Sequence, residues 1–309
     1  MTGPTTLNPK SRSEENGVNL QMDVSAPEGT GVSWLHAVLL GIIEGLTEFL
    51  PISSTGHMTI AERLLGYRLD DPGITAFTAV IQLGSILAAV AYFRGDIITI
   101  AGGWLAGLSR RDARDTPGYR MGWNVILGSI PIAVAGLAAR GIIEGPFRNL
   151  WVVVAGLVGW SVVMWVADRA ASAGRGEDSV TWVDALVIGA TQCFALVPGV
   201  SRSGATISAG LLRGIDRVSA TRVSFFLGIP ALLAAGGLEA MTQAGNISST
   251  VGWPPVLLGI AVAFATGYAS IAWLLRFVAH HSFTAFIVYR VLAALALSCL
   301  LVSGAVAAV

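Results

Sequence analysis

Charged residues are scarce in this sequence. They make up 12% of its 309 residues, whereas an average soluble domain has roughly 25%. Hydrophobic residues make up 54% of the chain, and its mean hydropathy is +0.69. A soluble protein of this length would need more charged residues to cover its surface. The composition therefore indicates a membrane protein.

Net charge, cysteines and a signal sequence are also lacking. The 19 basic and 19 acidic residues balance, and no basic cluster alternates with aromatic residues, so we expect no nucleic-acid partner. The two cysteines, Cys193 and Cys299, lie in apolar segments, where we interpret them as small buried hydrophobic residues and not as disulfide partners or metal ligands. The first 30 residues contain no apolar run typical of a signal peptide. We therefore predict a disordered polar tail over residues 1–32 and a protein that stays in the membrane.

Long apolar segments are what the sequence does have. Segments of about 18 to 25 residues recur, each long enough to cross a hydrocarbon core of roughly 30 Å. A buried helix of a soluble protein explains one such segment but not several. We predict an all-α polytopic membrane protein with one transmembrane domain over residues 33–305. Its six full transmembrane helices are expected at 75–93, 121–138, 150–167, 223–243, 255–275 and 285–305.

Two further apolar segments, 34–50 and 183–197, are shorter. At 1.5 Å per residue they reach only about 22 to 26 Å, which is marginal for a full crossing. Each ends before a proline and is followed by a small polar loop, 52–56 or 199–204, and then by more helix-compatible sequence. This pattern predicts two re-entrant helix hairpins. Irregular backbone at membrane depth is tolerated only where protein or water covers it, so the loops should mark a cavity.

The two predicted hairpins are similar to each other. Residues 41–56 (GIIEGLTEFLPISSTG) align with residues 189–204 (GATQCFALVPGVSRSG); the prolines pair at an offset of 147 and the last glycines at 148, so one insertion is needed. Three full spans follow each hairpin, and an odd number of crossings inverts the second copy. We predict inverted repeats over about 34–167 and 183–305, with the hairpins meeting near the midplane.

Basic residues indicate the orientation. The predicted topology places loops 94–120, 168–182, 213–222 and 276–284 on one side, and the positive-inside rule makes that side cytoplasmic. Hairpin one then opens to the outside. The cytoplasmic loops carry eleven basic residues: Arg94, Arg110, Arg111, Arg114, Arg120, Arg169, Arg175, Arg213, Arg217, Arg222 and Arg276. The other side carries six: Lys10, Arg12, Arg63, Arg68, Arg140 and Arg148.

The first hairpin carries ionisable residues at membrane depth. Glu44 and Glu48 are four residues apart and share one face of a helix. Carboxylates there are costly unless they are paired, protonated or bound to metal, so a salt bridge between helices is the structural alternative to catalysis. His57 follows the loop Ser53-Ser54-Thr55-Gly56. A lone histidine is often a buried core residue, but one among hydroxyls and carboxylates is a candidate for proton or phosphoryl transfer, and we favour that interpretation.

The second hairpin carries an anion-binding pattern. In residues 201–206 (SRSGAT) a glycine-containing loop leads into a helix, whose first N–H groups favour an anion. The Arg202 guanidinium adds a fork of donors that matches phosphate oxygens. The alternative is that Arg202 only neutralises Glu44 or Glu48. Together the two hairpins predict a site for a phosphorylated ligand.

Two long motifs carry a family resemblance. Residues 44–57 (EGLTEFLPISSTGH) and 198–206 (PGVSRSGAT) resemble the two signature motifs of bacterial undecaprenyl-diphosphatases, also called bacitracin resistance proteins. Residues 81–86 (IQLGSI) and the pair Tyr289-Arg290 are also similar to that family, and the likeness covers roughly residues 34–305. It implies hydrolysis of undecaprenyl diphosphate to the monophosphate and phosphate, a divalent cation such as Mg²⁺ or Ca²⁺, and recycling of the carrier lipid for peptidoglycan synthesis. It further implies location in the bacterial cytoplasmic (inner) membrane and bacitracin tolerance.

The motif match also implies residue roles. Glu44 and Glu48 would act as the catalytic acid pair, through a metal ion or a water, and Ser54 and His57 as nucleophile and acid–base. Which of these two attacks phosphorus is left open, and we favour Ser54 activated by His57. Arg202 would stabilise charge on the transferring phosphoryl group. Tyr289 and Arg290 are interpreted as structural. The expected substrate-binding residues are Ser53, Thr55, Gly56, Ser201, Ser203, Gly204, Thr206 and, unless it only packs helices, Gln82.

Two other function classes remain at this stage. A transporter or flippase of an anionic polyprenyl phosphate lipid has the same architecture of repeats and broken helices, whereas a non-catalytic scaffold would not explain Glu44, Glu48 and Arg202. Glutamates, serine and histidine on one hairpin favour the enzyme. Release of phosphate from farnesyl diphosphate would separate the two classes. The partners expected are a polyprenyl diphosphate lipid and the bilayer, and the sequence allows a homodimer.

Overall fold

A computed structural model describes residues 31–68, 71–139, 141, 149–171 and 174–308. Most of the predicted tail 1–32 lies outside these residues, as do Lys10, Arg12, Arg140 and Arg148, which entered the charge comparison. In the described residues every regular element is a helix, and the only β-type pairing is an isolated bridge between Arg175 and Ile215. The all-α prediction is confirmed.

Six helices are long and apolar enough to cross a membrane within the described part of the chain, as predicted. They overlap the six predicted segments and extend several of them by a few residues, but the first helix ends at Tyr92, before the predicted 93, and the last at Val302, before the predicted 305. A short π-helix, Ile247–Val251, prolongs one of them. These helices are α3 (Pro72–Tyr92), α5 (Pro117–Ala138), α7 (Leu150–Ala170), α10 (Arg217–Asn246), α11 (Trp253–Val278) and α12 (Thr284–Val302). The protein is therefore a multi-pass membrane protein.

Both predicted hairpins are present as helix, loop and helix. The first consists of α1 (Trp34–Phe49) and α2 (Ser54–Leu64). The second consists of α8 (Trp182–Gln192), a 3-10 turn over Cys193–Leu196, and α9 (Arg202–Leu212). The first break lies directly before Pro51, whereas α8 ends at Gln192 and its 3-10 turn continues to Leu196. In both hairpins the residue before the proline is extended, as its sterics require.

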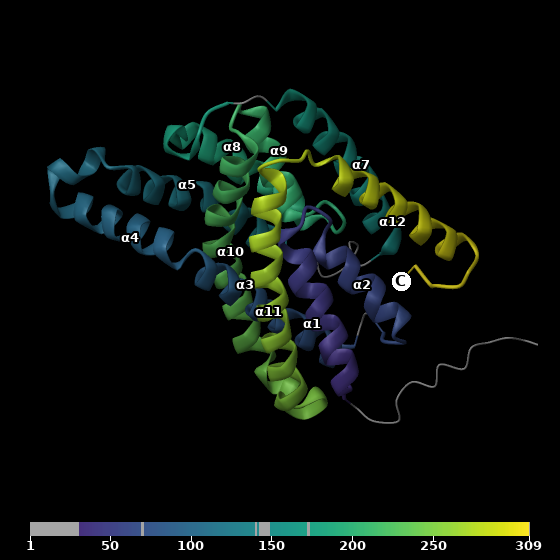
Figure 1. The fold of residues 1–309 in the computed structure, drawn as a ribbon. Helices are drawn as coiled ribbons and strands as arrows, with labels where there is room; N and C mark the ends of the chain where they lie inside the picture. Colours follow the sequence, from purple (N-terminus) through teal and green to yellow (C-terminus); the bar gives the residue numbers. More distant parts are fainter. Residues whose placement is uncertain (1–30, 69–70, 140, 142–148, 172–173, 309) are drawn as a thin grey trace, which may run out of the picture.

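The repeats exchange partners when they pack. Helix α1 packs on α11 and α8 packs on α5, while α3 packs on α10 and α7 on α12. Figure 1 shows α1, α3, α10 and α11 side by side in the centre, with α4 and α5 on one flank and α7 and α12 on the other. Each hairpin thus contacts the other repeat. This exchange supports the predicted division into two repeats, whose boundaries stay a prediction.

Glycines allow the two exchanged contacts to be close. A Cβ on Gly45 of α1 would come within 2.0 Å of the Thr266 hydroxyl on α11, and a Cβ on Gly189 of α8 within 2.0 Å of the Gly128 carbonyl oxygen on α5. Small residues bring helix backbones together in this way in membrane proteins. The close approach holds each hairpin firmly at the depth where its loop begins.

The connection 94–120 is not the simple loop that the sequence predicted. It contains helix α4 (Arg94–Ser109) and a 3-10 turn, Arg111–Asp115. Arg94 and Asp96 ended the predicted span, but the residues after them are apolar again, and Ile98 and Leu105 lie 71% and 59% exposed. At 16 residues α4 reaches only about 24 Å, which is why its length did not identify it. It packs against α5 and has no counterpart in the second repeat.

Candidate active site

The two hairpin loops share an unusual backbone feature. Ser53 and Ser201 precede α2 and α9 and have φ angles of 79° and 78°, a region that favours glycine. In each case the serine Oγ accepts a hydrogen bond from a glycine N–H three residues on, Gly56 at 3.3 Å and Gly204 at 3.2 Å. Such a backbone costs of order 1–3 kcal/mol and persists only where its surroundings enforce it. The surroundings here are the other hairpin.

Hydrogen bonds join the two loops directly. The Gly199 N–H of loop two donates to Ser53 Oγ of loop one at 3.2 Å. In return the Ser203 hydroxyl donates to the Leu50 carbonyl at 3.0 Å. Both serines are buried. The structure therefore brings the two predicted motifs together, although about 150 residues separate them in sequence.

Arg290, on α12, holds both loops. It is fully buried, and its Nη1 donates to the Pro51 carbonyl at 3.2 Å while its Nη2 donates to the Gly199 carbonyl at 2.8 Å. Further donors reach α7, at the Gly156 carbonyl and the Ser161 hydroxyl. Loop carbonyls that no helix satisfies find their donors here, which keeps irregular backbone stable at membrane depth. The structure gives Arg290 the structural role expected of it.

Glu48 connects the two hairpins chemically. The Ser54 hydroxyl donates to Glu48 Oε2 at 2.6 Å, and Gln82 Nε2 on α3 reaches the same oxygen at 3.5 Å. Arg202 Nε lies 3.4 Å from Glu48 Oε1 as an ion pair across the hairpins. The carboxylate is almost entirely buried, with a side chain 4% exposed. Four of the predicted site residues therefore meet at one point.

Gly228 leaves room for the Arg202 side chain. A Cβ on Gly228 of α10 would lie 2.0 Å from Arg202 Nη1, which instead donates to the Ser224 carbonyl at 3.3 Å. Because Gly228 has no side chain, the guanidinium can lie against α10 and still reach Glu48. This geometry is compatible with both roles weighed for Arg202. Its Nε pairs with Glu48, as a neutralising partner would, and its other N–H groups do not bond to Glu48 and could bind phosphate.

Glu44 lies one turn before Glu48 on the same helix. It is 3% exposed, and its Oε1 is buried with no hydrogen-bond partner among the described residues. Glu48 and Glu62 lie within electrostatic range of it. Glu62, on α2, is buried and accepts a hydrogen bond from Thr78 at 2.5 Å. Sequence reasoning missed Glu62, although a third carboxylate in the membrane was the available signal.

His57 differs from expectation in its partner. Its Nδ1 lies 2.8 Å from the Ser53 carbonyl and its Nε2 2.8 Å from the Tyr289 hydroxyl, with the two rings stacked. A carbonyl only accepts, so Nδ1 carries the proton, and in the neutral ring Nε2 accepts from Tyr289. The expected activation of Ser54 by His57 is not present in this arrangement, because Ser54 donates to Glu48. Tyr289, interpreted as structural, lies on the site.

The remaining predicted ligand residues serve the loops themselves. Ser203, bonded to loop one, also lies 3.1 Å from the Ser201 hydroxyl. The Thr206 hydroxyl lies 2.5 Å from that of Ser224 on α10, and it is fully buried. Thr55 is exposed. The buried hydroxyls of Ser203 and Thr206 therefore join helices in this structure and do not line an open cradle as we expected.

Gln192 was missed by the sequence reasoning. It lies three residues after Gly189, as Glu44 lies three after Gly41, so the two occupy matching positions in the repeats. Gln192 is fully buried, and within the described part of the chain neither its amide nitrogen nor its carbonyl oxygen has a hydrogen-bond partner. The pairing of the two repeats, position by position, was the signal that could have drawn attention to it.

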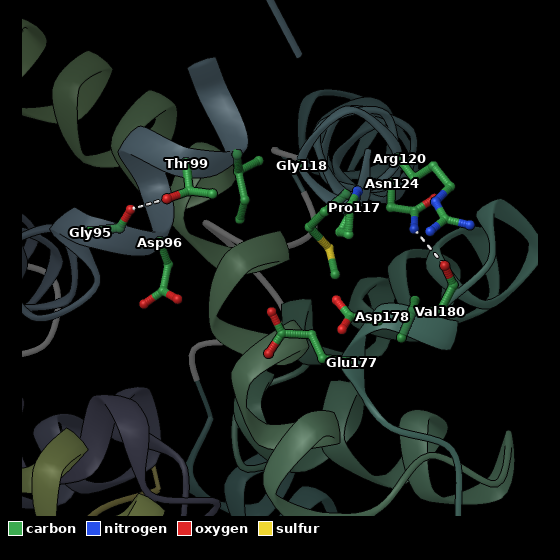
Figure 2. A pocket seen from close by; sticks show the side chains of 12 residues that line it. Gly95, Asp96, Thr99, Pro117, Gly118, Arg120, Asn124, Glu177, Asp178 and Val180 are labelled. Carbon is green, nitrogen blue, oxygen red and sulfur yellow. Dashed lines mark hydrogen bonds between the residues drawn. The ribbon is translucent and has the colours of Figure 1, made fainter. Parts of the chain in front are cut away.

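A cavity of about 180 Å³ lies away from the hairpin loops (Figure 2). Asp96 on α4 and Glu177 and Asp178 before α8 surround it, and Arg222 pairs with Asp96 at 2.6 Å and with Glu177 at 2.5 Å. None of its lining residues comes from the two signature motifs. The hairpins are the candidate site, because buried carboxylates, a hydroxyl and a guanidinium meet there.

Comparison with known proteins identifies the family of this chain. Residues 37–296 match the family model described as bacitracin resistance protein BacA. The chain belongs to the bacitracin resistance protein BacA family. Among similar proteins, "Undecaprenyl-diphosphatase" of Acidothermus cellulolyticus is 55% identical over 89% of this chain and 99% of its own length. "Undecaprenyl-diphosphatase 3" of Frankia casuarinae is 53% identical over the same shares, and "Undecaprenyl-diphosphatase" of Cutibacterium acnes is 51% identical over 90% and 100%. The BacA match includes both hairpins and all six candidate spans except the first three residues of α1 and the last residues of α12.

Proposed function

We propose that the two hairpins of this BacA-family protein form one active site that hydrolyses undecaprenyl diphosphate to undecaprenyl phosphate and inorganic phosphate. The protein is thus a membrane phosphatase that recycles a carrier lipid for peptidoglycan synthesis. Its family and its similar proteins, which carry the name undecaprenyl-diphosphatase, support this activity. The observation that supports the site most strongly is Glu48, which contacts Ser54 of its own hairpin and Arg202 of the other.

Ser54 is the proposed nucleophile. Its oxygen attacks the terminal phosphorus, its proton passes to Glu48 at 2.6 Å, and the bond from that phosphorus to the bridging oxygen breaks, so that undecaprenyl phosphate leaves. Water then cleaves the phosphoserine and releases phosphate. His57 is the alternative nucleophile, since its Nε2 faces only the Tyr289 hydroxyl. When Ser54 attacks, His57 acts as an acid–base group, and the Tyr289 hydroxyl orients the imidazole ring.

The second hairpin binds the charge of the substrate. Arg202 presents its guanidinium beside Glu48. Helix α9 begins at this residue, so the positive end of its dipole favours the anion, although the Gly204 N–H is already bonded to Ser201 Oγ. Charge developing on the equatorial phosphoryl oxygens is stabilised by such donors. Gln82 on α3 adds a further donor at the site, its Nε2 lying 3.5 Å from Glu48 Oε2. A transporter or flippase needs the anion-binding half only, whereas a hydroxyl bonded to a buried carboxylate favours the enzyme.

Glu44 and Glu48 are the residues proposed to hold a divalent cation, Mg²⁺ or Ca²⁺. Glu44 Oε1 is buried without a partner, which suits a cation ligand. In the described residues no group of three or more His, Cys, Asp or Glu side chains is placed to hold a metal ion. Mg²⁺ is commonly held by one or two carboxylates together with substrate phosphates, so two glutamates fit this mode. A bound cation would polarise the phosphoryl oxygens.

Chelation tests the metal proposal. We expect EDTA to abolish phosphate release from farnesyl diphosphate by the purified protein in detergent, and added Mg²⁺ or Ca²⁺ to restore it. The variant Glu44→Gln should raise the cation concentration needed for half-maximal rate, because it removes one charged ligand. Full activity in chelator would leave the two glutamates as proton handlers. Absence of phosphate release under all conditions, with intact substrate binding, would favour the transporter.

We place the protein in the bacterial cytoplasmic membrane, with the loop between α10 and α11 outside. The support is the excess of arginine in the opposite loops and the lipid substrate. The family description supports a role in bacitracin tolerance. Assembly as a homodimer stays a prediction, to be tested by the mass of the protein in detergent.

Thiol labelling tests the orientation. In a background with Cys193 and Cys299 replaced by alanine, we expect Ser249→Cys to react with an impermeant thiol reagent in intact cells. Ser109→Cys should react only after permeabilisation. Both serines are exposed, so the two variants are matched in chemistry. The opposite result would invert the assigned orientation without changing the repeats.

A further inference from the structure

An open groove of about 530 Å³ runs along the first half of α7. Trp151, Val152, Ala155 and Trp160 line it, so its wall is apolar and aromatic. Besides the indole N–H groups of its two tryptophans, the polar side chain among its lining residues is Asn149, whose Oδ1 accepts the Trp151 N–H at 2.8 Å as the cap of α7. The groove therefore offers a ligand apolar contact and no charge.

The inner end of the groove borders the second hairpin loop. Val197 and Val200 line it there, and Val200 directly precedes Ser201 and Arg202, where α9 begins. Gly156 lines the same end, and its carbonyl accepts from Arg290, which also holds both loops. The groove is thus continuous with the loop that carries the proposed diphosphate-binding residues.

The shape of the groove suits a chain. It is open along its length, and neighbouring residues of α7 face the bilayer, with Val158 and Val162 43% and 58% exposed. Two glycines, Gly156 and Gly159, keep the helix surface low beneath it. Its volume lies in the range that takes a drug-sized ligand, roughly 300–1,000 Å³, so it holds the first isoprene units of a long lipid and not its whole tail.

We propose that this groove binds the isoprene units nearest the diphosphate of the substrate. The proposal rests on the proposed function, because it assumes a polyprenyl diphosphate whose charged end lies at the hairpin loops. A tail attached to a phosphate at the start of α9 must pass from the polar loop to the bilayer, and Val200, which directly precedes Ser201, is the lining residue nearest that start in sequence. Apolar contact along the groove then contributes to binding through each buried methylene.

Gly159→Leu tests the groove. A Cβ at Gly159 would have no heavy atom within 4 Å, so a leucine fills the groove without clashing with the protein. We expect kcat/KM for undecaprenyl and farnesyl diphosphate to fall at least about tenfold, because the side chain displaces the tail. For dimethylallyl diphosphate kcat/KM should change less than about twofold, because its single isoprene unit occupies only the end of the groove beside Val200 and does not extend to Gly159.

The matched control is Gly136→Leu on α5, where a Cβ also has no heavy atom within 4 Å. It should leave all three substrates unaffected. Equal losses on all substrates, or no loss on the long ones, would overturn the groove. A photoreactive farnesyl diphosphate analogue gives a readout that needs no turnover. It should label α7 in the wild-type protein in competition with farnesyl diphosphate, but not in Gly159→Leu.

Labelling of α7 that farnesyl diphosphate does not displace would mean that ordinary bilayer lipid occupies the groove, and would overturn the proposal. These outcomes are distinct from failure of the proposed function. In that case the wild-type protein would release no phosphate from any prenyl diphosphate.

Discussion

Glu48→Gln should lower turnover by about a thousandfold. The substitution keeps the shape of the side chain, but an amide cannot accept the proton that the Ser54 hydroxyl now directs at Glu48 Oε2 over 2.6 Å. General-base catalysis of this kind contributes roughly 10²- to 10⁴-fold. The same change removes the charge that faces Arg202. Two functions of one buried carboxylate are lost together, so the effect should be among the largest in the protein.

The measurement is phosphate release per folded molecule, with monodispersity in detergent checked for each variant. Glu239→Gln is the matched control, because this glutamate lies on α10 outside both hairpins and its side chain accepts a hydrogen bond from its helix neighbour Gln243. It should keep near wild-type turnover. A well-folded Glu48→Gln protein with ordinary turnover would remove Glu48 from the proton pathway.

Arg202→Ala should likewise lose about a thousandfold or more. A donor aimed at developing phosphoryl charge supplies several kcal/mol of transition-state stabilisation, and each 1.36 kcal/mol corresponds to a factor of ten in rate. Alanine also leaves Glu48 buried without its cation. Arg202→Lys keeps the charge but not the two-point fork, so we expect it to stay about ten- to a hundredfold below wild type.

Lysine separates the two roles weighed for Arg202. If the side chain only neutralised Glu48, lysine would largely restore turnover, and alanine would chiefly reduce the amount of folded protein. Arg276→Ala is the matched control, since this arginine lies in the last turn of α11, away from the hairpins. A folded Arg202→Ala protein with near-normal turnover would separate the second hairpin from the active site.

The sequence by itself determined the elements. Membrane helices were predictable because a span needs a fixed length of apolar residues, and all six candidate spans lie where the apolar segments are. The two hairpins were predictable because proline breaks a helix locally. Helix α4 was not, since a segment of 16 residues with Arg94 and Asp96 at its start resembles a connector. The residue types of the site were also readable, because buried charge in a membrane is costly and therefore conspicuous.

Only the tertiary structure decided which side chains meet. Ser54 bonds to Glu48 and His57 to Tyr289, a choice that depends on how α12 lies beside α2 and on the strained turn at Ser53. Arg290 reaches both loops because exchanged packing of the repeats brings them within one side-chain length. Motif and spacing act along the chain, over a few residues. Contacts between hairpins about 150 residues apart depend instead on helix packing and on the direction in which each side chain leaves its helix.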